Sequence, residues 1–301
     1  MDDYPVDTGS SAAPQRLATV KRFYGSTVIL QTETGEDITA ATNSRSKTLV
    51  CGDKVHYRDA SEASMVTERL PRHSEFFRTD GFGRTKVIAA NVDQILLVLA
   101  SRPEAHMQVL DRYWVAAVNC GIPMCLVLNK SDLPESAVVS EILALYPKLG
   151  LSTLRVSAKT ANGLVELEKQ LADKTSVFVG PSGVGKSSLV NALMDSSGIK
   201  TAPLSLRREE GRHTTTTTTF YDLGQNARVL DAPGIRQFGL NHYDRVALEQ
   251  GFIEISEHAE YCRFRDCTHL NTLGCAVIEA AEDGRIDPRR LSSYQDLFKS
   301  L

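Results

Sequence analysis

The sequence predicts a multidomain protein with a small N-terminal β-barrel, a central α/β domain and a small C-terminal α-helical domain that binds a metal. Short β-type runs broken by turn residues fill residues 16–78, and apolar strands alternate with helical segments across residues 86–240. A cluster of cysteine and histidine lies within residues 241–301. Each pattern is typical of a different architecture, so the chain is expected to fold as successive domains.

Length and composition limit the class of protein. With 301 residues and 42% hydrophobic content, the chain can bury a full core and form about two or three domains. Its longest apolar run, residues 95–100, has the length of a buried strand and falls short of the ~20 residues that cross a bilayer. The acidic residues 1–5 lack the basic region and apolar stretch of a signal peptide. We expect a cytoplasmic protein without membrane contact, and a monomer.

The N-terminal region has the pattern of a tail followed by a barrel. Residues 1–15, rich in Asp, Ser, Ala and Pro, lack periodicity and are predicted to be disordered. Beyond them, β-type runs cover residues 17–23, 27–32, 53–58 and 65–70, with a turn signal at residues 35–37. Roughly five short strands in residues 16–78 favour a small closed barrel such as an OB-fold.

The central region alternates between strand and helix patterns. Strands are predicted at residues 94–100, 124–128, 153–156, 176–179 and 229–230. Helices are predicted at residues 110–119, 138–146, 163–171 and 186–194. Such alternation predicts a parallel sheet with helices on both faces. From residue 243 onward the strand pattern stops, which leaves helical segments and a terminal helix near residues 289–301.

A phosphate-binding loop is predicted where one of these strands meets a helix. The run G-P-S-G-V-G-K-S satisfies G-x-x-x-x-G-K-[ST], and its backbone N–H groups would cradle phosphates at the helix N-terminus. Lys186 would reach the outer phosphates as a catalytic residue, and the Ser187 hydroxyl would bind Mg²⁺. The predicted nucleotide-binding residues here are Gly180, Pro181, Ser182, Gly183, Val184, Gly185, Lys186, Ser187 and Ser188.

Two loops after neighbouring strands predict that the base is guanine. The first loop is Asn129, Lys130, Ser131 and Asp132, an N-K-x-D motif. Asp132 can accept two hydrogen bonds from guanine N1–H and N2–H₂, which adenine does not offer, so an ATP-dependent kinase is excluded mainly by Asp132. The second loop is Ser157, Ala158 and Lys159, in which the Ala158 N–H would meet the guanine carbonyl. Together the loops predict a site for GTP and GDP.

Two further segments would sense the γ-phosphate. Asp231 and Gly234 form a D-x-x-G element, in which Asp231 would hold Mg²⁺ through water and the Gly234 N–H would meet the γ-phosphate. Six threonines at residues 214–219 follow Gly211-Arg212-His213. One of them would complete the Mg²⁺ shell in the GTP state. The ligand is Thr214 or Thr215, with Thr215 taken as the working assignment, and the spacing leaves this choice open.

A metal site is predicted in the C-terminal domain. Cys262, Cys267, His269 and Cys275 offer three thiolates and one imidazole in one short loop, the ligand set of a closed structural zinc site. A full ligand set leaves no open position for chemistry, so the ion would stabilise a small domain. The alternative is a set of buried cysteines that bind no metal.

The order of the motifs is permuted. N-K-x-D and S-A-K precede the phosphate loop here, whereas an ordinary small GTPase begins with the phosphate loop. With the preceding barrel and the following cysteine cluster, the chain resembles the circularly permuted, ribosome small-subunit-dependent GTPase A family (RsgA, also called YjeQ). The resemblance implies a GTP hydrolase, stimulated by the small ribosomal subunit, that acts in late subunit maturation and then departs.

The resemblance also draws attention to His213. Ile235 stands where many GTPases carry the glutamine that orients the attacking water, so another group must position the nucleophile. His213 is the candidate, and a loop histidine without a catalytic role is the alternative. The chain also has Ala232 where the family usually has threonine; the lost hydroxyl is no required ligand, so we expect activity to survive.

RNA binding would depend on local patches, because the formal net charge is only −3. Basic residues on the barrel and the metal loop are candidates: Arg16, Lys21, Arg22, Arg45, Lys47, Lys54, Arg58, Arg263 and Arg265. We hypothesise that the γ-phosphate orders residues 204–220 and biases the orientation of the metal domain. The rival functions are an RNA-binding assembly factor for which hydrolysis is incidental, and a permuted GTPase that acts on the large subunit.

Overall fold

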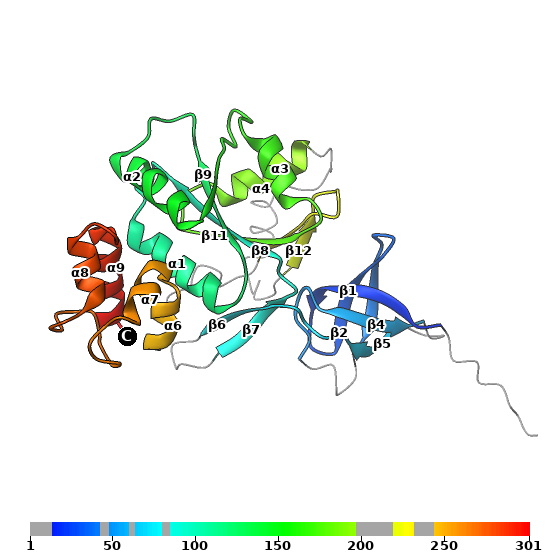
Figure 1. Ribbon diagram of the computed structural model, residues 1–301. Helices are drawn as coiled ribbons and strands as arrows, with labels where there is room; N and C mark the ends of the chain where they lie inside the picture. The colour runs from blue at the N-terminus through cyan, green and yellow to red at the C-terminus, as the bar shows by residue number, and fades with distance from the viewer. Residues whose placement is uncertain (1–13, 43–47, 60–63, 80–84, 197–218, 232–243) are drawn as a thin grey trace, which may run out of the picture. The chain divides into compact units, whose positions relative to one another are not determined.

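The computed structural model of the chain describes residues 14–42, 48–59, 64–79, 85–196, 219–231 and 244–301 (Figure 1). The chain divides into two compact units, Met1–Arg72 and His73–Leu301. The expected tail at residues 1–15 falls almost wholly outside the described residues. None of the helices in the described ranges combines the length and apolarity that crossing a membrane requires.

The first unit is a closed five-stranded barrel with the strand order β1-β2-β3-β5-β4. Its strands are β1 (Arg16–Phe23), β2 (Thr27–Thr32), β3 (Asp37–Ala41), β4 (Lys54–Arg58) and β5 (Ser64–Arg69). Alternate residues point inward because successive side chains of a strand face opposite sides, so Val20, Val28, Leu30 and Val55 are fully buried. A five-stranded Greek-key barrel is the OB-fold architecture, which confirms the predicted fold class.

The unit ends at a buried ion pair. Asp53, with no exposed surface, accepts hydrogen bonds from Arg72 Nε at 2.7 Å and Arg72 Nη2 at 2.9 Å. The Val50 N–H donates to the same carboxylate at 2.8 Å. The division after Arg72 lies a few residues before the end at residue 78 expected from the sequence. The hairpin of β6 (Glu75–Thr79) and β7 (Thr85–Ala90) belongs to the second unit.

The second unit is built on a six-stranded sheet with the order β10-β9-β8-β11-β13-β12. Its strands are β8 (Gln94–Ala100), β9 (Met124–Asn129), β10 (Ser152–Arg155), β11 (Thr175–Val179), β12 (Thr219–Asp222) and β13 (Arg228–Asp231). All neighbours are parallel except β12, which pairs antiparallel with β13 at the edge. The predicted parallel sheet is confirmed, with an antiparallel edge strand added.

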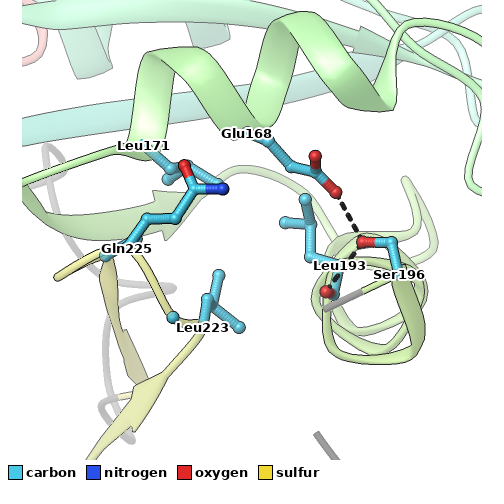
Figure 2. A pocket seen from close by; sticks show the side chains of 8 residues that line it. Glu168, Leu171, Leu193, Ser196, Leu223 and Gln225 are labelled. Atoms are coloured by element: carbon cyan, nitrogen blue, oxygen red, sulfur yellow. Dashed lines mark hydrogen bonds between the residues drawn. The ribbon is translucent and has the colours of Figure 1, made fainter. Parts of the chain in front are cut away.

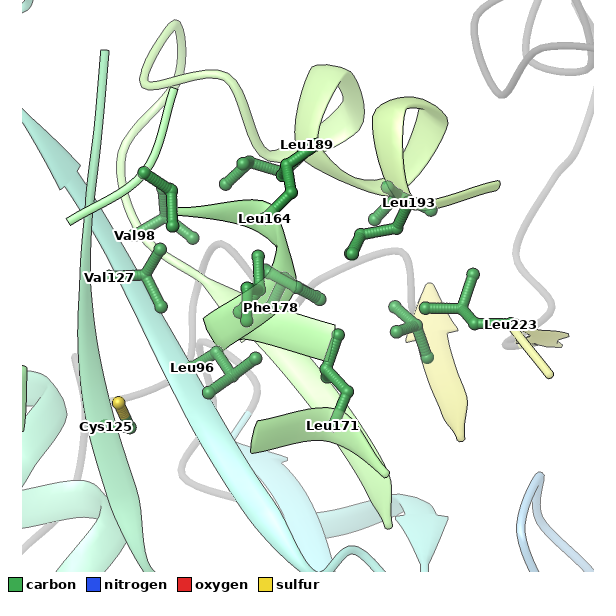
Figure 3. Packing of buried hydrophobic residues seen from close by; sticks show 14 of the residues in the cluster. Leu96, Val98, Cys125, Val127, Leu164, Leu171, Phe178, Leu189, Leu193 and Leu223 are labelled. Carbon is green, nitrogen blue, oxygen red and sulfur yellow. The ribbon is translucent and has the colours of Figure 1, made fainter. Parts of the chain in front are cut away.

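Helices cover both faces of this sheet. On one face, α3 (Leu164–Leu171) and α4 (Lys186–Ser196) pack on residues such as Leu96, Val127 and Phe178 (Figure 3). On the other face lie α1 (Met107–Asn119) and α2 (Ala137–Leu145), the latter continued by the short helix η2 (Tyr146–Leu149) (Figure 1). The connections through α1 and α2 run toward β10, whereas those through α3 and α4 run toward β13. Because such crossovers are right-handed, the two pairs of helices lie on opposite faces.

The C-terminal residues form four helices. They are α6 (Arg245–Gln250), α7 (Ile253–Ala259), α8 (Ala276–Glu282) and α9 (Pro288–Lys299). Of these, α6 and α9 pack on α1. Their core of Phe252, Ile255 and Tyr294 also includes Val115 of α1. A Cβ added at Gly251 would lie 2.5 Å from Val115 Cγ2, so the backbone must approach α1 closely there.

A buried arginine joins α9 to α1. Arg290 is 1% exposed, and it donates hydrogen bonds to Asp111 of α1 and to Glu254 of α7. Its guanidinium carbon lies 4.2 Å from the centre of the Phe252 ring and 5.2 Å from that of Trp114. Because charges so deeply buried are stable only when paired, this cluster holds the C-terminal helices on α1.

Candidate nucleotide and metal sites

The predicted phosphate and base loops meet at one edge of the sheet. The phosphate loop follows β11, and the two base loops follow β9 and β10. These strands run parallel, so all three loops leave the sheet at the carboxyl ends of its strands. From β8 the chain proceeds toward β9, whereas from β11 it proceeds toward β13, so the strand order reverses between β8 and β11. Ligands of open α/β sheets bind at such a switch point.

The phosphate loop adopts a backbone that only glycines tolerate. Gly180 and Gly185 have φ values of +130° and +94°. A Cβ at Gly180 would lie 2.3 Å from the carbonyl oxygen of Val98, and one at Gly185 would lie 2.3 Å from Asn129 Nδ2. Lys186, at the start of α4, donates to the carbonyls of Gly180 at 2.8 Å and Pro181 at 2.6 Å. The ammonium group therefore lies over the loop that is expected to cradle phosphates.

Asn129 and Lys130 join the predicted base loops to the phosphate loop. Asn129 Nδ2 donates to the Val184 carbonyl at 2.9 Å, and Asn129 Oδ1 accepts from the Ala158 N–H at 3.2 Å. Lys130 Nζ donates to the Gly183 carbonyl at 2.8 Å and to the Arg102 carbonyl at 2.7 Å. The sequence predicted only nucleotide contacts for these two side chains. The structure adds a loop-to-loop role that no local pattern reveals, because their partners lie far away in the chain.

Asp132 lies at the solvent-facing end of this network. Its Oδ1 accepts a hydrogen bond from the Ser157 hydroxyl at 2.6 Å. This bond, with smaller contributions from Lys159 and Lys130, holds the pKa of Asp132 below its ordinary value. The carboxylate is thus kept ionised, as an acceptor of two guanine N–H groups must be. Ser131 of the N-K-x-D loop and Lys159 of the S-A-K loop complete the same pair of loops.

The β12–β13 pair brings together one described residue from each predicted phosphate sensor. Thr219, which ends the threonine run, is the register partner of Asp231, which begins the D-x-x-G element. His213, Thr214, Thr215 and Gly234 lie outside the described residues. Ser187 and Ser188 lie in the first turn of α4.

The four predicted metal ligands converge. Their ligand atoms all lie within 4.8 Å of one another. His269 Nδ1 lies 3.6 Å from Cys262 Sγ and 3.3 Å from Cys275 Sγ, and the two sulfurs are 3.9 Å apart. A tetrahedral zinc ion with Zn–S of about 2.3 Å and Zn–N of about 2.0 Å needs separations of about 3.5 Å for S–N and about 3.8 Å for S–S. The donor set therefore fits zinc.

Burial shapes the protonation of this cluster. His269 is 1% exposed, and burial lowers its pKa, which favours the neutral imidazole that metals bind. Burial raises the pKa of Cys275 to about 12, so its thiol would lose a proton when a metal binds. His269 has a φ of +58°, a left-handed conformation that is typical of a tight turn.

A separate pocket lies at the other end of α4 from the phosphate loop (Figure 2). Leu171, Leu193 and Leu223 line it, and Ser196 Oγ donates to Glu168 Oε1 at 2.5 Å at its rim. It contains none of the residues for which the sequence predicted a role.

The sheet carries an N-K-x-D loop, an S-A-K loop and then a phosphate loop, in this order along the chain. This order defines a circularly permuted P-loop GTPase. The model of the RsgA GTPase family matches residues 69–241. The chain belongs to this family, whose members are GTP hydrolases, and the predicted family and activity are confirmed.

Similar proteins cover nearly the whole chain. The small ribosomal subunit biogenesis GTPase RsgA of Pseudomonas syringae pv. tomato is 40% identical over 97% of this chain and 88% of its own length. The protein of the same name from Pseudomonas fluorescens Pf0-1 is 44% identical over 84% of this chain and 75% of its own length.

Solved structures show the same architecture. YjeQ from Thermotoga maritima superposes with a TM-score of 0.79 at 29% identity, covering 96% of this chain and 99% of its own. YloQ, described as a circularly permuted GTPase, gives a TM-score of 0.74 at 22% identity, with 97% and 96% covered.

Proposed function

We propose that this protein binds the small ribosomal subunit and acts in its late maturation, hydrolysing GTP on subunit stimulation and leaving in a nucleotide-dependent step. The name shared by the relatives supports the partner, and the Asn129 bridge supports the nucleotide. One amide connects the phosphate loop to both base loops, so phosphate and base would be recognised as one ligand. Because the relatives are named for ribosomal subunit biogenesis, we infer that the protein is cytoplasmic, and we propose that it acts as a monomer.

The nucleotide roles follow from position. Lys186 would move from the loop carbonyls to the outer phosphates, and Ser187 and Asp231 would hold Mg²⁺, which neutralises charge on those phosphates. Asp132 would accept the guanine N–H groups, with Ser157 fixing its ionised state. Thr215 or Thr214 would complete the Mg²⁺ shell, and His213 would orient the attacking water.

A structural zinc ion would occupy the cluster of three cysteines and one histidine. The separations between ligand atoms and the buried, neutral imidazole support this assignment. Zinc would supply the cross-link that lets a loop of residues 262–275 hold one shape.

The basic groups of the barrel differ in their availability to RNA. Arg16 pairs with Asp59 at 2.8 Å, and Lys21 with Asp37 at 2.6 Å. Lys54 and Arg58 are exposed at alternate positions of β4, which places both on the outer face of one strand. These two residues are the better candidates for phosphate contacts with ribosomal RNA.

The effect of the bound nucleotide on ribosome binding would reach the metal domain through α6. Rotation of all four C-terminal helices would separate the buried Arg290 from Asp111, at a cost of about 3–5 kcal/mol. Helix α6 follows the D-x-x-G segment in the chain and contacts the metal loop, so it can respond without such a rotation. A smaller movement of α6 alone would therefore be the less costly way for the nucleotide to bias the metal domain.

Co-sedimentation tests the partner and the nucleotide dependence together. The full chain is mixed with small or large ribosomal subunits in the presence of GDP or a non-hydrolysable GTP analogue. We expect binding to the small subunit, tighter with the analogue. Equal affinity in both nucleotide states would refute nucleotide-dependent release, and preference for the large subunit would support the rival partner. A His213→Ala variant that still supports subunit maturation would favour the rival in which hydrolysis is incidental.

A further inference from the structure

Helix α6 presents two charged side chains to the predicted metal loop. Arg245 and Glu249 are four residues apart, so they lie on one side of the helix. Both contact residues of the loop between Cys262 and Cys275, and neither is a metal ligand. The sequence gives no sign of this role, because charged residues at this spacing are also typical of a solvent-exposed helix.

Glu249 faces the ring nitrogen of His269 that points away from the sulfurs. Glu249 Oε2 lies 3.3 Å from His269 Nε2, while Nδ1 faces Cys262 and Cys275. The His269 side chain is 2% exposed and that of Glu249 is 23% exposed, so water screens the contact only in part. An imidazole that binds a metal through Nδ1 carries its proton on Nε2, and a carboxylate there fixes that tautomer and the ring orientation.

Arg245 holds the backbone on the other side of the ligands. Its Nη1 donates to the Asp266 carbonyl at 2.8 Å, and its Nη2 donates to the carbonyl of the predicted ligand Cys267. The planar guanidinium fixes two successive carbonyls at once, which a lysine does not do. Its positive charge also offsets the surplus negative charge that three thiolates and Glu249 leave around a divalent ion.

We propose that Glu249 and Arg245 are positioning residues for the metal site: Glu249 fixes the metal-binding nitrogen of His269, and Arg245 fixes the backbone at Cys267. The proposal rests on the zinc site proposed above. Through these contacts α6 becomes part of the metal centre, although it comes before the whole ligand loop in the chain. Metal affinity therefore depends on a helix that belongs to the packing against α1.

Zinc affinity of the full chain tests the proposal. The metal-stripped protein is titrated with zinc against a chromophoric chelator, for the wild type and for the Glu249→Ala, Glu249→Gln and Glu257→Ala variants. Glu257 is an exposed carboxylate on the neighbouring helix α7, so its removal matches the loss of charge without touching the cluster.

Glu249→Ala should weaken zinc binding by about 10- to 100-fold. Glu249→Gln keeps an oxygen acceptor for Nε2–H and should recover part of that loss, and Glu257→Ala should bind as the wild type does. With cobalt in place of zinc, saturated Glu249→Ala should still give the visible spectrum of tetrahedral sulfur and nitrogen ligation, which shows that the ligands themselves are intact.

The outcomes separate the two proposals. A wild type that binds no zinc refutes the zinc site itself. Wild-type affinity in Glu249→Ala, or equal losses in the alanine and glutamine variants, overturns the role of Glu249 and leaves the zinc site standing. If Glu249→Ala is insoluble, Glu249→Gln is compared with Glu257→Gln instead. Only Glu249→Gln should weaken zinc binding, and equal zinc affinities of the two variants would refute the proposal. For Arg245, the Arg245→Lys variant should also bind zinc more weakly, and wild-type affinity would refute that part.

Discussion

Substituting alanine for Gly185 should uncouple the phosphate loop from the base loops. The new Cβ would lie 2.3 Å from Asn129 Nδ2, so the buried amide must move. If the Asn129 amide moves, it loses its hydrogen bonds to the Val184 carbonyl, at 2.9 Å, and to the Ala158 N–H, at 3.2 Å. Two hydrogen bonds at about 1 kcal/mol each give about 2 kcal/mol, or a roughly 30-fold weaker affinity for GDP.

Gly224→Ala is the matched control. Gly224 has a φ of +80°, close to the +94° of Gly185, but a Cβ there would meet nothing within 4 Å. Both variants therefore carry a backbone strain of about 1–2 kcal/mol, and only Gly185→Ala disturbs Asn129. Binding of a fluorescent GDP analogue, with thermal unfolding of each variant measured in parallel, separates the two effects. If folded Gly185→Ala binds GDP as tightly as Gly224→Ala, the bridging role of Asn129 is wrong.

Three further predictions concern the base site and the buried cluster. Asp132→Asn should lower GTP affinity by on the order of 10²-fold or more and favour xanthosine triphosphate, because an amide offers one acceptor and one donor. In a competition assay between the two nucleotides, an unchanged preference for GTP would contradict this. Ser157→Ala removes the hydrogen bond that lowers the pKa of Asp132, so that pKa should rise toward its ordinary value of 3.8. GTP affinity, measured at a series of pH values, should then begin to fall at a higher pH than in the wild type. An unchanged pH dependence would show that Ser157 does not control the ionisation of Asp132. Arg290→Met leaves Asp111 and Glu254 buried without their partner and should lower the free energy of unfolding in urea by about 3–5 kcal/mol, and a change near zero would show that the cluster does not hold α9 on α1.

Strands and loops with a strong local pattern could be predicted from the sequence. The bounds of β8, Gln94–Ala100, agree with the prediction, because every residue of this strand is buried and the six that follow Gln94 are apolar. The phosphate loop is fixed by its glycines, whose positive φ values no other residue adopts readily. The cluster of three cysteines and one histidine was found because these residue types are few and lie close together in the chain.

Elements defined by distant partners could not be predicted. Strand β3 (Asp37–Ala41) was given no range because its composition is polar and small, and pairing with β2 and β5 decides it. Strand β12 exists through its pairing with β13 at the sheet edge. Arg290 reads as an exposed residue of a terminal helix, yet its partner Asp111 is 179 residues away, and only the fold brings them together.

Turnover of GTP by the purified chain, alone and with small or large ribosomal subunits, tests the central claim most directly. The same assay with ATP checks the role assigned to the base loops. We predict slow hydrolysis of GTP alone, strong acceleration by the small subunit only, and no turnover of ATP. Tight GTP binding without any acceleration by the small subunit would contradict the proposed ribosomal role while leaving the permuted GTPase fold intact.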